Sequence, residues 1–268
     1  EKSGLFQQSL SGEGSDRADL GLPGVQTELL KELNTLGKPI VLILVNGRPL
    51  TLKWEKENIS AIIEAWYPGE EGGNAIADVL FGDYNPGGKL PISFPKETGQ
   101  LPVYYNRKPL AFNQYISTDA QALFPFGHGL SYTRFEYTDL NISPKEIKSL
   151  EKIEIQCKVK NVGHQAGDEV IQLYIQDPIA SLVRPVKELK GFKRIHLEPD
   201  EERTIAFTLF PDQLAFYDEY MRFIIEPGLF NVMVGSSSED IRLSGQFEVI
   251  KELHLTKYRH FKSEVTVQ

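Results

Sequence analysis

The chain has 268 residues, a formal net charge of −8 and 41% hydrophobic residues, the composition of an ordinary folded protein long enough for two domains. The acidic balance argues against nucleic acid and anionic membranes as partners, because both bind basic surfaces. No apolar run is long enough to span a membrane, and no signal peptide is visible. The single cysteine, Cys157, excludes a disulfide framework and is expected to be a buried small hydrophobe.

The first half of the chain alternates predicted helices with predicted strands. Pro23 opens a helix whose apolar stripe, at helical spacing, ends at Gly37. Residues 39–45 (PIVLILV) are apolar throughout, which is typical of a strand covered on both faces. The next expected elements are a short helix at 56–59, a strand at 61–66, a helix at 73–81 and a strand at 90–94. This order predicts an α/β domain with helices packed on a mostly parallel sheet.

From about residue 140 the apolar residues alternate with polar ones, which indicates strands with one buried face. The clearest runs are 153–159, 170–175, 205–209 and 230–234. Turn sequences such as Glu226-Pro-Gly228 separate them, and about seven short strands are expected in roughly one hundred residues. The second half is therefore predicted to be an all-β sandwich of the immunoglobulin-like or fibronectin type III-like kind.

A glycine-rich turn, Ser11-Gly-Glu-Gly-Ser-Asp-Arg17, precedes the first predicted helix. Gly12 and Gly14 flank Glu13, so the backbone there can take positive φ and approach a ligand closely. Asp16 and Arg17 are expected to pair and to hold the turn. The same residues also fit a solvated loop with a surface ion pair, and the turn alone does not decide between the two interpretations.

Longer strings carry a family resemblance. Residues 67–94 (YPGEEGGNAIADVLFGDYNPGGKLPISF), 124–132 (FPFGHGLSY) and 184–192 (RPVKELKGF) resemble the C-terminal part of glycoside hydrolase family 3. With the turn at its start, the resemblance runs from Ser11 to about Val249. Strings of this length make chance a poor explanation. Two further strings, 44–50 (LVNGRPL) and 101–105 (LPVYY), resemble the periplasmic β-glucosidase type within that family.

The resemblance implies three parts in order: a TIM-type barrel with an aspartate nucleophile, an α/β sandwich domain with the acid/base on a loop, and a fibronectin type III-like domain. The chain is expected to hold the last two and to lack the barrel. Residues 1–94 are then the C-terminal portion of the α/β sandwich domain, 95–139 a long linker packing on both domains, and 140–250 the fibronectin type III-like domain. Residues 251–268 stay unassigned, either a final strand with a solvated extension or sequence foreign to the family.

The resemblance makes Glu13 the general acid/base of a retaining, exo-acting β-glucosidase that releases terminal β-D-glucosyl residues. Such enzymes need two carboxylates about 5 to 5.5 Å apart. The other one, the nucleophile, belongs to the barrel, so the isolated chain is expected to be inactive. Ser15 is expected to border the leaving-group subsite, and Asp16 and Arg17 to support the loop. No cofactor or metal is expected, and the substrate is a β-linked oligosaccharide or an aryl or alkyl β-glucoside.

Two competing functions and several further expectations accompany this interpretation. A β-xylosidase of the same family and a non-catalytic carbohydrate-binding or scaffolding module are the competing functions. The resemblance implies a periplasmic or secreted location, and a homodimer is left open.

Arg48, after a buried strand, fits either a ligand site or an ion pair. His128 is expected to be a hydrogen-bonded loop anchor, since no partner His or Cys lies at ligand spacing. The aromatic residues expected to pack rather than bind sugar are Trp54, Trp66, Tyr104 and Tyr105.

Overall fold

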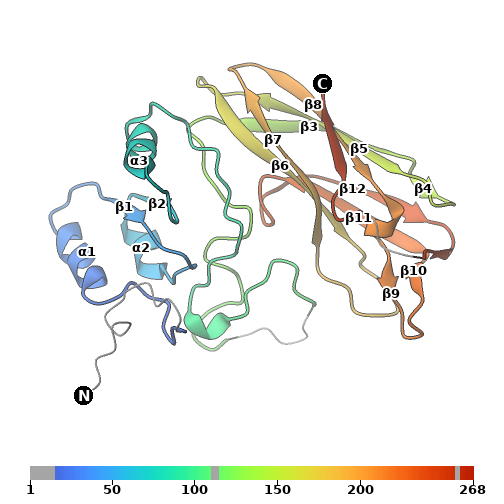
Figure 1. Cartoon of the computed structure of the whole chain (residues 1–268), viewed down its shortest axis with the longest axis horizontal. Coiled ribbons are helices and arrows are strands. Elements are labelled where there is room, and N and C mark those ends of the chain that lie inside the picture. Colours follow the sequence, from blue (N-terminus) through green and yellow to red (C-terminus); the bar gives the residue numbers. More distant parts are fainter. Residues whose placement is uncertain (1–15, 110–114, 257–259) are drawn as a thin grey trace. The chain divides into compact units, whose positions relative to one another are not determined.

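A computed structural model describes residues 16–109, 115–256 and 260–268 of the chain. They fall into two compact units (Figure 1). The first unit comprises the chain up to Tyr84 with Ile92–Val103 and Asn113–Phe124. The second comprises Asn85–Pro91, Tyr104–Phe112 and Pro125–Gln268. Both units therefore draw residues from the stretch 95–139.

The first unit is built around a parallel pair of strands. β1 (Val41–Leu44) pairs with β2 (Ala61–Glu64), and the helix α2 (Lys53–Asn58) lies between them in the chain. α1 (Gln26–Asn34) precedes β1, and α3 (Gly72–Phe81) follows β2. A strand, helix and parallel strand in this order confirm the predicted α/β class. Within the described residues, no helix is long and apolar enough to cross a membrane.

Two expectations for the first unit are wrong. Residues 90–94 form no strand; only an isolated bridge joins Phe94 to Phe124, because Pro91 has no N–H to donate to a ladder. β1 is also not covered on both faces, since Val41 and Ile43 remain 39% and 37% exposed. The described residues supply only two strands here, so there is too little sheet to enclose β1.

The second unit is an all-β sandwich, as predicted. One sheet has the strand order β4-β12-β11-β6-β7, the facing sheet has the order β14-β8-β5-β3, and a small sheet has the order β13-β10-β9. The strands are β3 (Phe135–Ser143), β4 (Glu146–Ile147), β5 (Ile153–Asn161), β6 (Gly167–Gln176), β7 (Glu188–Leu197), β8 (Glu202–Leu209), β9 (Phe216–Tyr217), β10 (Phe223–Ile225), β11 (Gly228–Gly235), β12 (Ile241–Val249), β13 (Leu253–His254) and β14 (Glu264–Val267).

The core of the sandwich follows the predicted alternation. Along β5 the residues Ile153, Ile155 and Cys157 are buried, and they share one apolar cluster with Leu173 of β6 and Val232 of β11. Burial raises the pKa of the Cys157 thiol to about 12, which agrees with its predicted role as a small hydrophobe. The inner faces of both sheets therefore supply the core of this unit.

The C-terminal tail contributes strands to the sandwich unit. β14 pairs antiparallel with β8, with Val265 opposite Phe207. The backbone N–H of His260 donates to Asp212 Oδ2 at 2.8 Å, and its ring stacks on Phe210 at a centroid distance of 3.7 Å. Of the two alternatives for residues 251–268, the structure favours the one with a final strand.

Candidate functional site

The residues predicted to form the catalytic turn are only partly described. Glu13 and Ser15 lie outside the described residues. Asp16 is exposed, and Arg17 donates from Nη2 to the carbonyl of Gly21 at 3.0 Å. Among the described residues no ion pair joins Asp16 to Arg17, so Arg17 braces the chain that follows it through a backbone carbonyl instead.

Leu20 attaches the end of this segment to the first unit. It is the first buried residue of the described chain, at 8% exposure. Its N–H donates to Thr98 Oγ1 at 3.1 Å, and its carbonyl accepts from the N–H of Thr51 at 2.9 Å. These two bonds come from separate segments of the unit, so the position of the backbone is fixed at Leu20.

A polar cluster lies at the carboxyl ends of β1 and β2. Glu64 accepts hydrogen bonds from the N–H of Trp66 at 3.0 Å and from Asn46 Nδ2 at 3.4 Å. Asn46 Oδ1 in turn accepts from the N–H of Arg48 at 3.2 Å. Burial raises the pKa of the Glu64 carboxyl, and the two hydrogen bonds to it oppose that rise. The carboxyl edge of parallel strands is where α/β sheets commonly bind ligands.

The backbone of this cluster adopts an uncommon conformation. Trp66 has a φ of +52°, which is rare for a bulky residue. Its N–H bond to Glu64 and the packing of its ring on Phe94, at a centroid distance of 5.9 Å, hold it there. Beside it, a Cβ on Gly47 would lie 2.6 Å from the Tyr67 ring, so a larger residue there would require this exposed ring to move.

Sequence reasoning missed Glu64 and only partly interpreted its neighbours. The sequence did contain a signal for Glu64: it is an acidic residue near the carboxyl end of the predicted parallel strand 61–66. Trp66 packs internally, as expected. Tyr105 also packs as expected, since it stacks on Phe126 at a centroid distance of 4.3 Å and its hydroxyl accepts from the N–H of Leu189 at 3.2 Å. For Tyr104 the expectation of packing is wrong, since its side chain is 64% exposed.

His128 takes part in hydrogen bonding of the loop that carries it. Its carbonyl accepts from the N–H of Leu90 at 2.8 Å, and its N–H donates to the carbonyl of Pro125 at 3.1 Å. This agrees with the predicted loop anchor.

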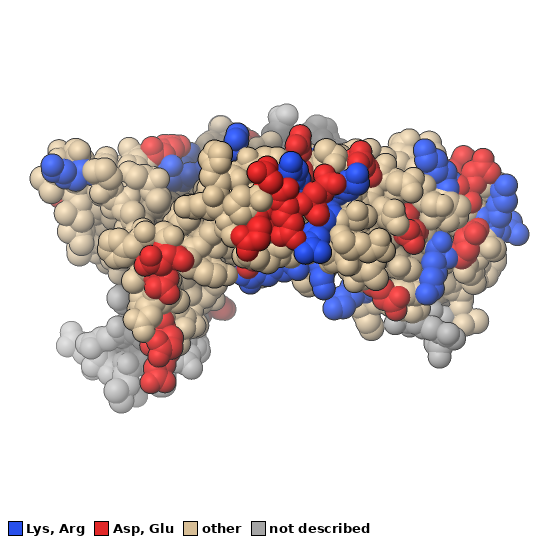
Figure 2. All heavy atoms as spheres, turned by 90° about the horizontal axis from the view of Figure 1, so that it is seen from above, with Lys and Arg blue, Asp and Glu red and all other residues tan. Residues whose placement is uncertain are grey.

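In the described part of the chain, no three His, Cys, Asp or Glu side chains come together in a way that could hold a metal ion. Figure 2 shows Lys and Arg interspersed with Asp and Glu on the face in view.

Comparison with known protein families identifies both units. Residues 4–132 match the glycosyl hydrolase family 3 C-terminal domain, and residues 169–238 match the fibronectin type III-like domain. The first match includes the turn at residues 11–17 and the cluster at the carboxyl ends of β1 and β2.

Several relatives are similar over most of the chain. A periplasmic beta-glucosidase of Salmonella typhimurium is 44% identical over 254 residues, which are 91% of this chain and 33% of that protein. A beta-xylosidase of Formosa agariphila is 46% identical over 232 residues, covering 85% of this chain and 32% of that protein. The crystal structure of a beta-glucosidase from Listeria innocua in complex with glucose is 42% identical with a TM-score of 0.85, covering 89% of this chain and 35% of that one.

This chain spans about a third of the length of the curated relatives that it matches. The similarity extends through both units and is not confined to one motif. The chain belongs to glycoside hydrolase family 3, of which it carries the C-terminal domain followed by a fibronectin type III-like domain.

Proposed function

We propose that the chain is the C-terminal part of a retaining, exo-acting β-glucosidase that hydrolyses terminal non-reducing β-D-glucosyl residues, with Glu13 as its general acid/base. The observation that carries the proposal is the 44% identity over 254 residues to a protein named beta-glucosidase. The family match over residues 4–132 includes Glu13, which supports its assignment.

The proposed reaction divides between two carboxylates. An aspartate outside this chain attacks the anomeric carbon while Glu13 gives its proton to the departing glycosidic oxygen. Water then attacks the glycosyl-enzyme, Glu13 takes a proton from that water, and the aspartate leaves as a carboxylate. Because Glu13 fills only one of the two roles, the isolated chain is proposed to be inactive.

The described residues that follow the turn are better placed to support the loop than to take part in the reaction. The backbone bonds of Leu20 to Thr51 and Thr98 fix the chain where it enters the first unit. Arg17 braces the segment between that point and the turn through the Gly21 carbonyl. We assign Arg17 and Asp16 to supporting the loop and Ser15 to the border of the leaving-group subsite.

Replacing Glu13 by Gln in the full protein that carries this chain tests the acid/base role. On cellobiose, whose leaving group needs a proton, we expect kcat/KM to fall by about 100-fold or more. On 2,4-dinitrophenyl β-glucoside, whose leaving group departs as a stable anion, the loss in kcat/KM should be much smaller, because kcat/KM reports the formation of the glycosyl-enzyme and not its hydrolysis. Glu70→Gln, an exposed carboxylate of the same unit, is the matched control and should leave both rates within about twofold. Equal losses on the two substrates would contradict the assignment.

A β-xylosidase is the second candidate, because a protein named beta-xylosidase is 46% identical to the chain over 232 residues. The ratio of kcat/KM on aryl β-glucoside to kcat/KM on aryl β-xyloside separates the two candidates. A ratio well above one supports the β-glucosidase, and a ratio well below one supports the β-xylosidase. A non-catalytic module would give no turnover on either substrate even in the full protein.

A periplasmic or secreted location is part of the proposal. It is supported by the name of the Salmonella typhimurium relative, a periplasmic beta-glucosidase. For the organisation of the chain, we propose residues 95–139 as the linker and 140–250 as the fibronectin type III-like domain. The strands of the sandwich extend past both bounds, since β3 begins at Phe135 and β14 ends at Val267.

A further inference from the structure

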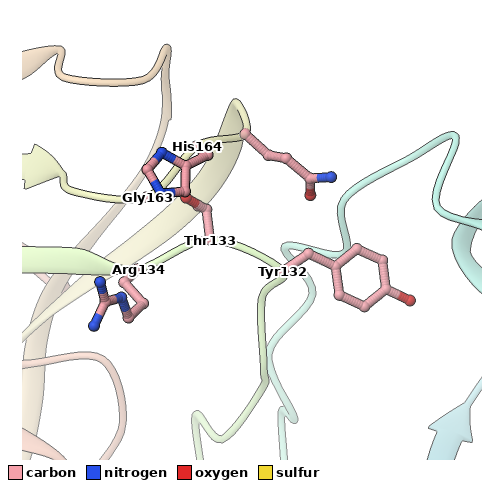
Figure 3. A pocket seen from close by; sticks show the side chains of 6 residues that line it. Tyr132, Thr133, Arg134, Gly163 and His164 are labelled. Carbon is pink, nitrogen blue, oxygen red and sulfur yellow. The ribbon is translucent and has the colours of Figure 1, made fainter.

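The pocket at the start of β3 has a firmly held frame, but its side chains do not converge. Its volume is about 490 Å³, and the fully buried Asn161 accepts from Thr133 Oγ1 at 2.6 Å beside it. Figure 3 shows the ring of Tyr132 pointing away from Arg134 and His164, so these side chains do not face a common ligand. In the first unit, by contrast, polar groups converge on one backbone position.

That position is Leu20, whose N–H bonds to a side chain far away in the sequence. The N–H donates to Thr98 Oγ1 at 3.1 Å, across 78 positions of the chain. Among the described residues, Thr98 supplies the one side chain that bonds to this backbone, since the Leu20 carbonyl accepts from the main-chain N–H of Thr51. A single hydroxyl therefore decides whether the N–H of this buried residue has a partner, and a buried N–H without one is costly.

A buried glutamine holds the turn that carries Thr98. Gln100 is 5% exposed and ends the 3₁₀ turn Thr98–Gln100. Its Oε1 accepts from the N–H of Lys96 at 2.6 Å, and its Nε2 donates to the carbonyls of Asp119 at 2.6 Å and Gln121 at 3.3 Å. An ion pair of Lys96 Nζ with Asp119 at 2.7 Å joins the same two segments again. The Thr98 hydroxyl therefore projects from a frame that is fixed within the first unit.

The segment that leads from the predicted turn to Leu20 is short and braced. Arg17 Nη2 donates to the carbonyl of Gly21 at 3.0 Å. This bond closes a loop of chain around Leu20, and Thr98 attaches that loop to the unit. Glu13 stands four positions before Arg17 in the sequence, so a shift of Leu20 moves the point from which the chain leads to Glu13.

We infer that Thr98 is a positioning residue for proton transfer by Glu13, because its hydroxyl holds the backbone at Leu20. The inference rests on the proposed function, since it concerns the step assigned to Glu13. A general acid must lie within hydrogen-bond reach of the oxygen that it protonates, and a misplacement of about 1 Å can cost about 100-fold in rate. The proposed nucleophile lies outside this chain, so its attack should not depend on Thr98.

Thr98→Val in the full protein tests the positioning role, because valine has the shape of threonine but no acceptor. We expect kcat/KM on cellobiose, whose leaving group needs the proton, to fall by about tenfold. On 2,4-dinitrophenyl β-glucoside the loss in kcat/KM should be less than about twofold, because this leaving group departs without a proton. Thr98→Ser keeps the hydroxyl and should stay within about twofold of the parent on both substrates.

Thr35→Val is the matched control. Thr35 is exposed in the same unit, and its hydroxyl donates to the carbonyl of Glu32 at 2.7 Å, so this variant loses a threonine hydroxyl bond that does not involve Leu20. It should leave both values of kcat/KM within about twofold. If Thr98→Val fails to fold, Thr98→Cys replaces it, because its thiol is only a weak acceptor and should give the same unequal losses.

Glu13→Gln, measured in the same assays, separates the inference from the proposed function. If Glu13→Gln lowers kcat/KM far more on cellobiose than on the dinitrophenyl glucoside, while Thr98→Val lowers both equally or neither, the inference is overturned and the proposed function stands. Equal losses for Glu13→Gln on the two substrates would overturn both, since Thr98 would have no proton donor to position. A loss for Thr98→Ser as large as that for Thr98→Val would also overturn the inference, because the hydroxyl would not be the group that acts.

Discussion

Two asparagines and one glutamate show how single side chains position the backbone in this chain. Asn161 and Asn85 each use an amide to join segments that are distant in sequence, and Glu64 holds the backbone of Trp66 at a positive φ. All three side chains act on backbone groups. An amide that bridges several backbone groups replaces hydrogen bonds that a turn cannot make by itself.

The role of Asn161 predicts a large loss of stability when its side chain is removed. Asn161→Ala would leave buried groups of Thr133, Gly163 and Leu197 without partners, so we expect the free energy of unfolding to fall by about 2–4 kcal/mol. Urea unfolding followed by far-UV circular dichroism measures this loss. Asn141→Ala, an exposed position on β3, is the control and should cost less than about 0.5 kcal/mol. A similar small loss for both variants would show that the network contributes little.

Such residues were hard to foresee from the sequence. No pattern in the sequence identifies Asn161 as a residue that joins distant segments, because its partners lie as far as 36 positions away in the chain. Glu64 was not singled out at all. The Asp16 and Arg17 pair was expected from adjacency alone, whereas the structure gives Arg17 a carbonyl partner at Gly21. Local pattern predicts which residues are polar in a turn, but tertiary contacts decide what each of them binds.

At the scale of elements, the connection between β6 and β7 combines exposed apolar residues with half-buried charges. Ile179 is 84% exposed, and the N–H of Ser181 donates to Glu226 Oε2 at 2.8 Å. Next to this loop, burial raises the pKa of Asp177 to about 6; the carboxylates of Glu226 and Glu188 add to the rise, and the charge of Arg184 opposes it. The sequence RPVKELKGF, which carried part of the family resemblance, thus forms the end of a loop and the start of β7.

Asp177 predicts a dependence of stability on pH. Its pKa is higher in the folded state than the ordinary value of 3.8, so its favourable contribution is complete below about pH 4 and is lost as the pH rises through about 6. Asp177→Asn removes the buried charge and should stabilise the protein at pH 7 by about 1 kcal/mol, after allowance for partial exposure. At pH 4 the gain should vanish.

Thermal unfolding of Asp177→Asn and the parent at pH 4, 5, 6 and 7 checks the prediction. Glu219→Gln, an exposed carboxylate of the same unit, should show no such trend. If the difference between Asp177→Asn and the parent were the same at every pH, the carboxylate would not be the group that titrates.

The sequence predicted elements best where their periodicity was complete. The alternation in β5, β6, β8 and β11 located these strands because each has one continuous buried face. Among the long strands, β3, β7 and β12 were not located, and β3 begins inside the predicted linker. The buried face of β7 is interrupted by Lys190, which is buried and paired with Glu188. In β12 the exposed residues alternate with half-buried or buried ones, but Gly245 interrupts the apolar face. The predicted strand 90–94 failed because its apolar residues are separated by a proline.

At the scale of the whole molecule, the chain contains two units that bury their apolar side chains to different extents. The sandwich unit has a continuous core drawn from both of its sheets. The α/β unit has only two described strands and leaves large apolar side chains exposed, among them Leu36 at 66% and Phe81 at 80%. The family was predictable because its strings are long and contiguous. The role of Glu13 was predicted only through that resemblance, and Glu13 lies outside the described residues.

The central claim is that this chain supplies the acid/base of a retaining glycosidase, and azide rescue of Glu13→Ala in the full protein tests it most directly. Removing the acid/base leaves the nucleophile intact, so a glycosyl-enzyme still forms from 2,4-dinitrophenyl β-glucoside but water attacks it slowly. Azide needs no general base, and we predict that it accelerates turnover by about tenfold or more and yields β-glucosyl azide. Absence of acceleration, or formation of α-glucosyl azide, would contradict the account.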